Sequence, residues 1–332
     1  MVVAQGRPPF IEAIRGQLQA LVGETESISS ELLERLLRHQ HVLVIVDHFS
    51  EMSEATRREI RPGHPDFSVN ALVVTSRMEE PLDGVPKSTI KPLRIEGNRL
   101  SSFMEAYLRQ RGRRDLFDDP EYFDACRRLS LMVGQRNITV LLAKLYAELL
   151  ISAKEGLREN DLPDNIPDLM LSYVNELNRG SGKDAPDNRS VHRDVKALAW
   201  ECLRPTFRPG FVKHDTAIIV LAGDDPEARL AHLEDRLRIV QSIGPAQDHL
   251  RFALDPLAEY LAGLHLVALN GDNTELWQTF FDQVDAIAGS TNAIESFLRA
   301  VWDCCAVRGS EERVPAFVPF GLSQRADLTH AA

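Results

Sequence analysis

The sequence predicts a mainly α protein with an α/β part on its N-terminal side. Two short apolar runs, at residues 42–46 and 71–74, have the length and the β-branched composition of buried parallel strands. From residue 99 onward, apolar side chains recur instead at helical spacing. Apolar runs at residues 238–243 and 250–254 flank a Gly-Pro turn, interrupt the helices and predict a hairpin.

Two helices are expected to precede the first strand and to cover the sheet. Ser29 or Ser30 is the expected N-cap of the second helix, because a hydroxyl there can accept a backbone N–H of the first turn. The expected elements are, in order, a helix at 10–22, a helix at 29–39, the first strand, a loop at 62–66, the second strand, and either a further strand or an extended crossover at 90–95.

The rest of the chain is predicted to be helical apart from the hairpin. A polar, Gly-rich loop at residues 178–187 divides it. Helices that lead into a terminal hairpin suggest a winged-helix module. Further helices are expected at 190–203, 214–222, 226–236 and 255–269, with a short helical segment and a polar end at 274–332. The sequence therefore divides into four expected domains, 1–95, 96–180, 185–268 and 270–332.

Composition narrows the class of protein. With 332 residues, 44% of them hydrophobic, the chain is long enough for two or three packed cores. A net charge of −11 argues against a nonspecific binder of nucleic acid, since Lys and Arg supply most of that affinity. The four cysteines form no CxxC pair and predict reduced core thiols in the cytoplasm. Neither a signal peptide nor a stretch of ~20 apolar residues is present, so no membrane association is expected.

Acidic residues follow the first predicted strand. Asp47 comes directly after the apolar run, and Glu51 lies four residues further on. Ligands of open α/β sheets bind outside the carboxyl ends of the strands, where Asp47 could hold Mg²⁺ beside a nucleotide. Glu51 could then orient or deprotonate an attacking water. The alternative is a buried strand capped by a surface acid.

Polar and basic residues follow the second predicted strand. Thr75, Ser76 and Arg77 come after its apolar run. The guanidinium of Arg77 is a fixed positive charge with a planar set of donors, suited to a phosphate or to the Asp47 carboxylate. The alternative is a solvated loop arginine.

In their order along the chain, these segments resemble the NACHT subgroup of the signal-transduction ATPases with numerous domains, over roughly residues 7–268. The likeness rests on four motifs. Asp47 and Glu51 match the Walker B acids, and Thr75-Ser76-Arg77 matches sensor 1. The lid helix of the family, Pro-Leu-x-Leu, resembles Asn137-Ile-Thr-Val-Leu-Leu142. The family signature Phe-x-His-x-x-Phe-x-Glu-Tyr-Leu-Ala, which closes the winged helix, is similar to Phe252-Ala-Leu-Asp-Pro-Leu-Ala-Glu259-Tyr260-Leu261-Ala262. Ile138 and Leu254 stand where the family has proline and histidine.

The resemblance implies a partial P-loop NTPase sheet of the AAA+ type, a helical lid, a winged helix and a C-terminal helical segment. It also implies a switch that rests with ADP and assembles into oligomers after exchange for ATP. Asp47 would then be the Mg²⁺ ligand, Glu51 the catalytic acid, and Thr75 and Arg77 the residues that bind the nucleotide.

The sequence contains no Walker A loop, the Gly-x-x-x-x-Gly-Lys-Ser/Thr that binds the phosphates. Gly182-Lys183 is followed by Asp184, and Lys87-Ser88 is preceded by Pro86, so neither segment can wrap a phosphate. We therefore expect a chain truncated at its N-terminus, whose partner is the missing NTPase half or an effector domain. On its own, such a chain should bind ATP weakly and should not hydrolyse it.

Two other functions remain open. A winged helix could bind DNA through a helix in the major groove, which would make the chain a transcriptional regulator. Alternatively, the chain is a helical scaffold for protein interactions with a degenerate ATPase core. The densest basic cluster, Arg109-Gln-Arg-Gly-Arg-Arg114, is interpreted as a solvated helix end.

Overall fold

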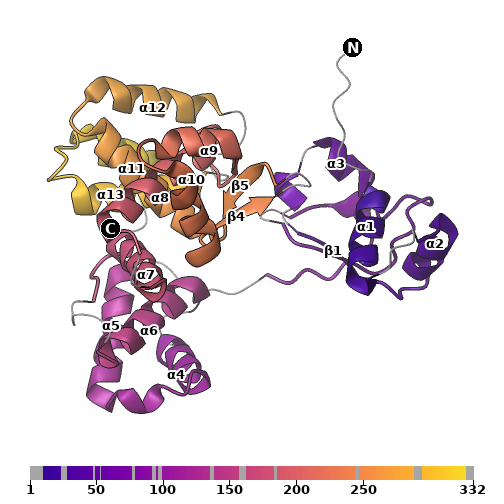
Figure 1. Ribbon diagram of the computed structural model, residues 1–332, viewed down its shortest axis with the longest axis horizontal. Helices are drawn as coiled ribbons and strands as arrows, with labels where there is room; N and C mark the ends of the chain where they lie inside the picture. The colour runs from indigo at the N-terminus through magenta and orange to yellow at the C-terminus, as the bar shows by residue number, and fades with distance from the viewer. Residues whose placement is uncertain are drawn as a thin grey trace. The chain divides into compact units, whose positions relative to one another are not determined.

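The chain forms two compact units, Met1–Pro92 and Leu93–Ala332, each with its own hydrophobic core (Figure 1). The structure is a computed structural model that describes residues 10–23, 28–47, 49–52, 54–76, 79–91, 95, 99–134, 138–156, 162–182, 185–243, 247–287 and 294–326. The described residues are mainly helical with two small sheets, as the sequence predicts. The finer division into four domains stays a prediction.

The first unit packs two helices against a pair of parallel strands. Its elements are α1 (Phe10–Val22), α2 (Ser30–Arg38), β1 (Val44–Val46), η1 (Phe49–Glu51), α3 (Glu54–Glu59), β2 (Leu72–Val74) and η2 (Leu82–Gly84). The two predicted helices are confirmed, and Ser29 is the N-cap of α2, where its hydroxyl accepts the N–H of Leu32 at 3.2 Å. Helix α3 was not predicted, because none of its side chains is buried and it shows no apolar periodicity.

The two predicted strands pair in parallel, with Ile45 opposite Val73. Val44 and Val46 are buried on the face that packs against Leu33 and Leu37 of α2. Ile45 and Val73 point to the other face and are 64% and 45% exposed. The expected buried strand is therefore buried on one face, the face that the described helices of this unit cover.

The expected strand or crossover at residues 90–95 is described only in part, because residues 92–94 lie outside the described residues. Residues 85–91 have no regular structure, and Ile90 is 88% exposed. Ile95 makes an isolated antiparallel bridge to Ile138, with an N–H to carbonyl distance of 2.8 Å. The choice between a strand and an extended crossover therefore stays open.

The second unit is built from helices and one small sheet. Its helices are α4 (Leu100–Gln110), α5 (Asp119–Val133), α6 (Val140–Lys154), α7 (Ile166–Gly180), α8 (Asn188–Leu203), α9 (His214–Leu221), α10 (Pro226–Ala231), α11 (Asp255–Asn270), α12 (Thr274–Ala286), α13 (Glu295–Arg308) and α14 (Phe317–Arg325), with short turns η4 (Arg114–Leu116) and η5 (His232–Arg236). Among the described residues after 270 the chain forms three helices, rather than the expected short segment. Within the described ranges, no helix has both the length and the apolar character needed to cross a bilayer.

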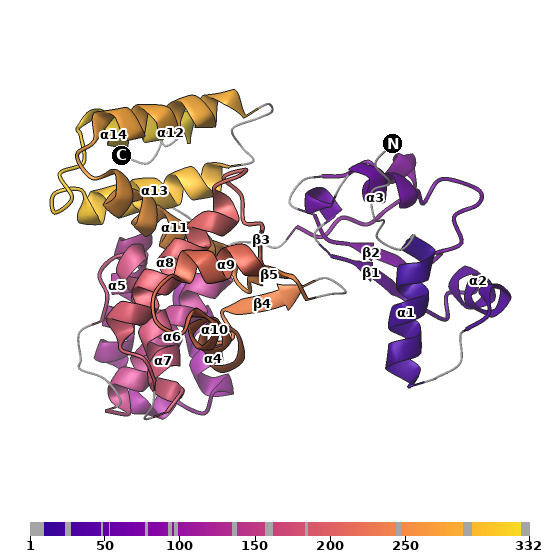
Figure 2. The ribbon, with the colours of Figure 1, turned by 45° about the horizontal axis from the view of Figure 1, so that its top comes forward.

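The sheet of the second unit has three antiparallel strands in the order β3, β5, β4 (Figure 2). The predicted hairpin is present as β4 (Val240–Ile243) and β5 (His249–Phe252). Strand β3 (Phe211–Lys213), whose Val212 lies opposite Leu250, was not predicted because it is only three residues long. Helices α9 and α10 lie next to this sheet (Figure 2).

A buried ion pair joins the helices beside this sheet. Asp194 of α8 and Arg229 of α10 have side chains that are 6% and 15% exposed. The Arg229 Nε donates to Asp194 Oδ2 at 2.8 Å, and its Nη1 donates to the carbonyl of Ala222 at 3.0 Å, just after α9. The hydrogen bond to Asp194 raises the pKa of Arg229. One guanidinium thus holds α8, α10 and the end of α9 together.

Replacing Asp194 with alanine should strongly destabilise the second unit, because it leaves the Arg229 charge buried without its partner. We expect the free energy of unfolding to fall by about 3–5 kcal/mol, measured by urea denaturation. The control is Glu201→Ala on the same helix, which breaks an i,i+3 pair with the 61% exposed Arg204 and should cost less than about 1 kcal/mol. Similar losses in the two variants would contradict this assignment.

Three half-buried histidines also lie in the second unit. Burial lowers the pKa of His192, His232 and His265 below the ordinary value near 6.5. The positive charge of Lys196 lowers the pKa of His192 and His265 further. The folded chain therefore binds fewer protons at these sites than the unfolded chain does in mildly acidic solution.

The stability of the second unit should consequently depend on pH. A base whose pKa is lowered on folding contributes its full stabilisation above the unfolded pKa and loses it as the pH falls. We expect the urea midpoint to decrease between about pH 6.5 and pH 5. The double variant His192→Gln/His265→Gln should reduce this decrease, whereas His39→Gln, an exposed residue of the first unit, should not. An unchanged slope in the double variant would refute the assignment.

Candidate functional site

The ends of β1 and β2 bring together two of the predicted site residues. Thr75 N–H donates to the carbonyl of Val46 at 2.9 Å, and Phe49 N–H donates to the carbonyl of Thr75 at 2.9 Å. The Thr75 hydroxyl donates to the Asp47 carboxylate. Both residues are exposed at the same edge of the sheet, as the parallel strands require. The hydroxyl therefore orients the carboxylate that the sequence assigned to Mg²⁺.

The other two predicted site residues cannot be placed as fully. Glu51 lies in η1, on the loop that follows Asp47, but its side chain is outside the described part of the chain. Arg77 also lies outside the described residues. The neighbouring Ser76 hydroxyl donates to Glu80 Oε1 at 3.3 Å. The roles predicted for Asp47, Glu51, Thr75 and Arg77 stay predictions.

The chemistry available to Asp47 is that of a single carboxylate. Across the described residues, no three His, Cys, Asp or Glu side chains are grouped so that they could hold a metal ion. Mg²⁺ needs octahedral oxygen coordination and commonly takes it from one or two carboxylates, water and the phosphates of a nucleotide. Asp47 fits that arrangement only if phosphates supply other ligands.

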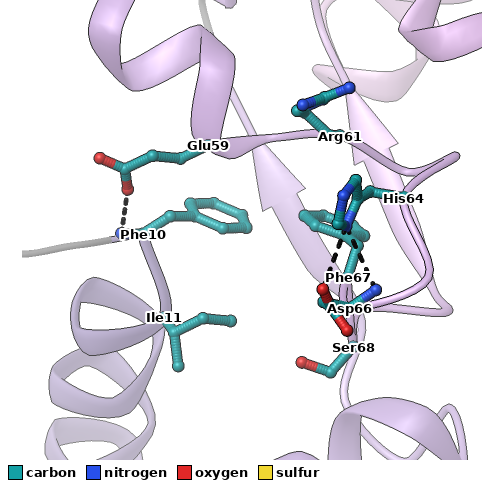
Figure 3. A pocket seen from close by; sticks show the side chains of 8 residues that line it. All are labelled: Phe10, Ile11, Glu59, Arg61, His64, Asp66, Phe67 and Ser68. Carbon is teal, nitrogen blue, oxygen red and sulfur yellow. Dashed lines mark hydrogen bonds and ion pairs between the residues drawn. The ribbon is translucent and has the colours of Figure 1, made fainter.

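A cavity of about 390 Å³ lies elsewhere in the first unit, between the start of α1 and the loop at residues 61–68 (Figure 3). Its walls include the rings of Phe10 and Phe67, which stack with centroids 6.1 Å apart. At the start of α1, Phe10 N–H donates to Glu59 Oε2 at 2.6 Å (Figure 3). Glu59 ends α3 and Phe67 precedes β2, so the cavity lies at the end of the sheet opposite Thr75. It is therefore separate from the predicted nucleotide site.

The basic run at residues 109–114 is neutralised by carboxylates. The pairs are Arg109–Glu105 at 2.7 Å, Arg111–Glu148 at 2.8 Å, Arg113–Glu155 at 2.6 Å and Arg114–Asp119 at 2.8 Å. Arg111 and Arg113 thereby connect the end of α4 to α6. The run therefore lies at the solvated end of α4, as interpreted from the sequence, and its ion pairs also connect that end to α6.

The segment 252–262, which resembles the family signature ending in Glu-Tyr-Leu-Ala, packs against α13. Tyr260 hydroxyl donates to Asp303 Oδ2 at 2.6 Å, and Ser296 hydroxyl donates to Glu259 Oε1 at 2.6 Å. Glu259 and Asp303 are each 6% exposed. A Cβ added at Gly263 would lie 3.1 Å from the Cys304 sulfur, so α11 and α13 approach closely there. The signature residues of this chain thus hold the C-terminal helices in place.

Those C-terminal helices match a known family. Residues 288–330, which include α13 and α14, match the family model of the NACHT C-terminal helical domain 4. This match supports a NACHT-type protein. No curated protein matches the chain.

The charge pairing at residues 109–114 predicts how the chain behaves toward DNA. We expect no retardation of a random duplex at about 0.15 M salt, because the arginines are already paired and the net charge is −11. Replacing Glu105, Glu148 and Glu155 together with glutamine would unpair three arginines and should produce weak, salt-sensitive retardation. Retardation of the unaltered chain at that salt would favour the DNA-binding alternative.

Proposed function

We propose that the chain is part of a NACHT-type, nucleotide-dependent signalling switch. The observation that carries this proposal is the match of residues 288–330 to the NACHT C-terminal helical domain 4. The arrangement of Asp47 and Thr75 at one edge of a parallel sheet supports it independently, since such an edge is where α/β proteins bind ligands.

In this proposal, ATP or ADP with Mg²⁺ occupies the edge of the sheet after β1 and β2. Asp47 holds the metal, and the Thr75 hydroxyl keeps its carboxylate oriented. Arg77 contacts a phosphate, and Glu51 orients the attacking water. The first unit is then a partial P-loop NTPase sheet.

The proposal assigns a winged helix to residues 185–268 and a helical lid to residues 96–180. The three-stranded antiparallel sheet β3–β5–β4, with α8, α9 and α10 around it, supports the first assignment. The grouping of α4, α5, α6 and α7 supports the second. In this region Arg204 pairs with Glu201 and Arg229 with Asp194, and such pairing disfavours DNA binding.

The switch needs a partner, because no Walker A loop occurs in the 332 residues. We propose that another NTPase segment supplies the amides and the lysine that grip the phosphates. Further parts of the proposal are an effector domain, assembly into a homo-oligomer on activation, and a cytoplasmic location. Without the loop, the largest electrostatic anchor for the phosphates is missing, so the 332-residue chain alone binds nucleotide weakly.

Calorimetric titration of the 332-residue chain with Mg-ATP should give a dissociation constant weaker than about 1 mM. The longest in-frame product of the same locus should carry a Walker A loop and retain ADP on purification. In that product, Asp47→Asn should weaken Mg-ATP binding at least about tenfold, or about 1.4 kcal/mol. Asp66→Asn, an exposed acid at the other end of the sheet, should leave binding unchanged.

Micromolar binding by the 332-residue chain would overturn the need for a partner. Loss of nucleotide from the longest product, or equal effects of the two variants, would favour the interaction scaffold instead.

A further inference from the structure

The cavity between the start of α1 and the loop at residues 61–68 takes no part in the proposed switch. Its volume of about 390 Å³ lies within the range of small-molecule sites. Phe10, Ile11 and Phe67 form its apolar walls, and each of the three is only partly buried, so a ligand can reach them. We call this space the α1 cavity.

Two exposed carboxylates also line the α1 cavity. Glu59 is the last residue of α3, and Asp66 lies in the loop. Glu59 Oε2 accepts the N–H of Phe10 at 2.6 Å, which holds the carboxylate beside the cavity (Figure 3). Among the described residues, nothing donates to the other oxygen, Oε1. A donor on a ligand in the cavity can therefore bind this carboxylate.

The two basic side chains that line the α1 cavity are compensated. Arg61 Nε lies 3.6 Å from Asp83 Oδ2, and Asp83 is outside the cavity wall. His64 Nδ1 accepts the N–H of Asp66 at 3.3 Å, and this hydrogen bond needs a neutral ring, because an imidazolium has no acceptor. The negative charges of Glu59 and Asp66 therefore exceed the positive charge of the cavity wall.

We propose that the α1 cavity binds a small organic ammonium ion with an apolar body. The ammonium donates a charge-assisted hydrogen bond to Glu59, and the apolar body packs on Phe10, Ile11 and Phe67. An anionic ligand of the same shape is repelled by Glu59 and Asp66. This proposal does not depend on the nucleotide switch, because the α1 cavity lies at the other end of the sheet.

The test uses the full 332-residue chain and ligand-observed NMR titrations with 2-phenylethylamine, 2-phenylethanol, 3-phenylpropionate and methylamine. The phenylethylamine should bind at least about tenfold more tightly than each of the others, since only it offers both a positive charge and an apolar body. Equal binding of the amine and the alcohol, equal binding of methylamine, tighter binding of the carboxylate, or no binding of phenylethylamine would each overturn the proposal.

Two matched variants locate the site. Glu59→Gln removes the negative charge but keeps an oxygen that can accept the N–H of Phe10, and it should weaken phenylethylamine binding about tenfold. Glu54→Gln alters the first residue of the same helix, which pairs with Arg58 outside the cavity wall, and should change binding less than about twofold. Equal effects of the two variants would show that the amine binds elsewhere. If Glu59→Gln lowers the helical circular dichroism signal, the comparison of ligands on the unaltered chain decides.

Discussion

Parallel pairing of β1 with β2 is the constraint on which the candidate site depends. Asp47 and Thr75 are 28 positions apart in the sequence, yet they touch because the carboxyl ends of parallel strands meet at one edge. An antiparallel register would place them at opposite ends of the sheet. Helix α3 lies in the connection that makes the parallel register possible.

Buried polar contacts play the corresponding role in the second unit. The acids Glu259 and Asp303 are costly to bury unless they are hydrogen-bonded, and the hydroxyls of Ser296 and Tyr260 provide those bonds. They tie α11 to α13, the first helix of the segment that matches the NACHT C-terminal helical domain 4. The segment 252–262, which resembles a signature of nucleotide-dependent switches, therefore connects α11 to α13 in this chain, whether or not a nucleotide is bound.

Hydrophobic periodicity and capping residues predicted most of the regular elements, but they could not predict contacts between residues distant in the sequence. The bounds of α1 and the Ser29 cap of α2 follow from local physics, and so does the position of Asp47 after an apolar strand. Helix α3 was missed because it buries no side chain. The composition of β1 could not show that Ile45 faces outward, since that depends on how many helices cover the sheet.

The exposed face of the first sheet makes this unit prone to pair with other strands. Ile45 and Val73 present aliphatic surface on two three-residue strands, which pair only with each other among the described residues. Exposed β-rich segments of this kind recruit other strands and promote aggregation. A contact that covered Ile45 and Val73 would remove this apolar surface from water and would stabilise the first unit.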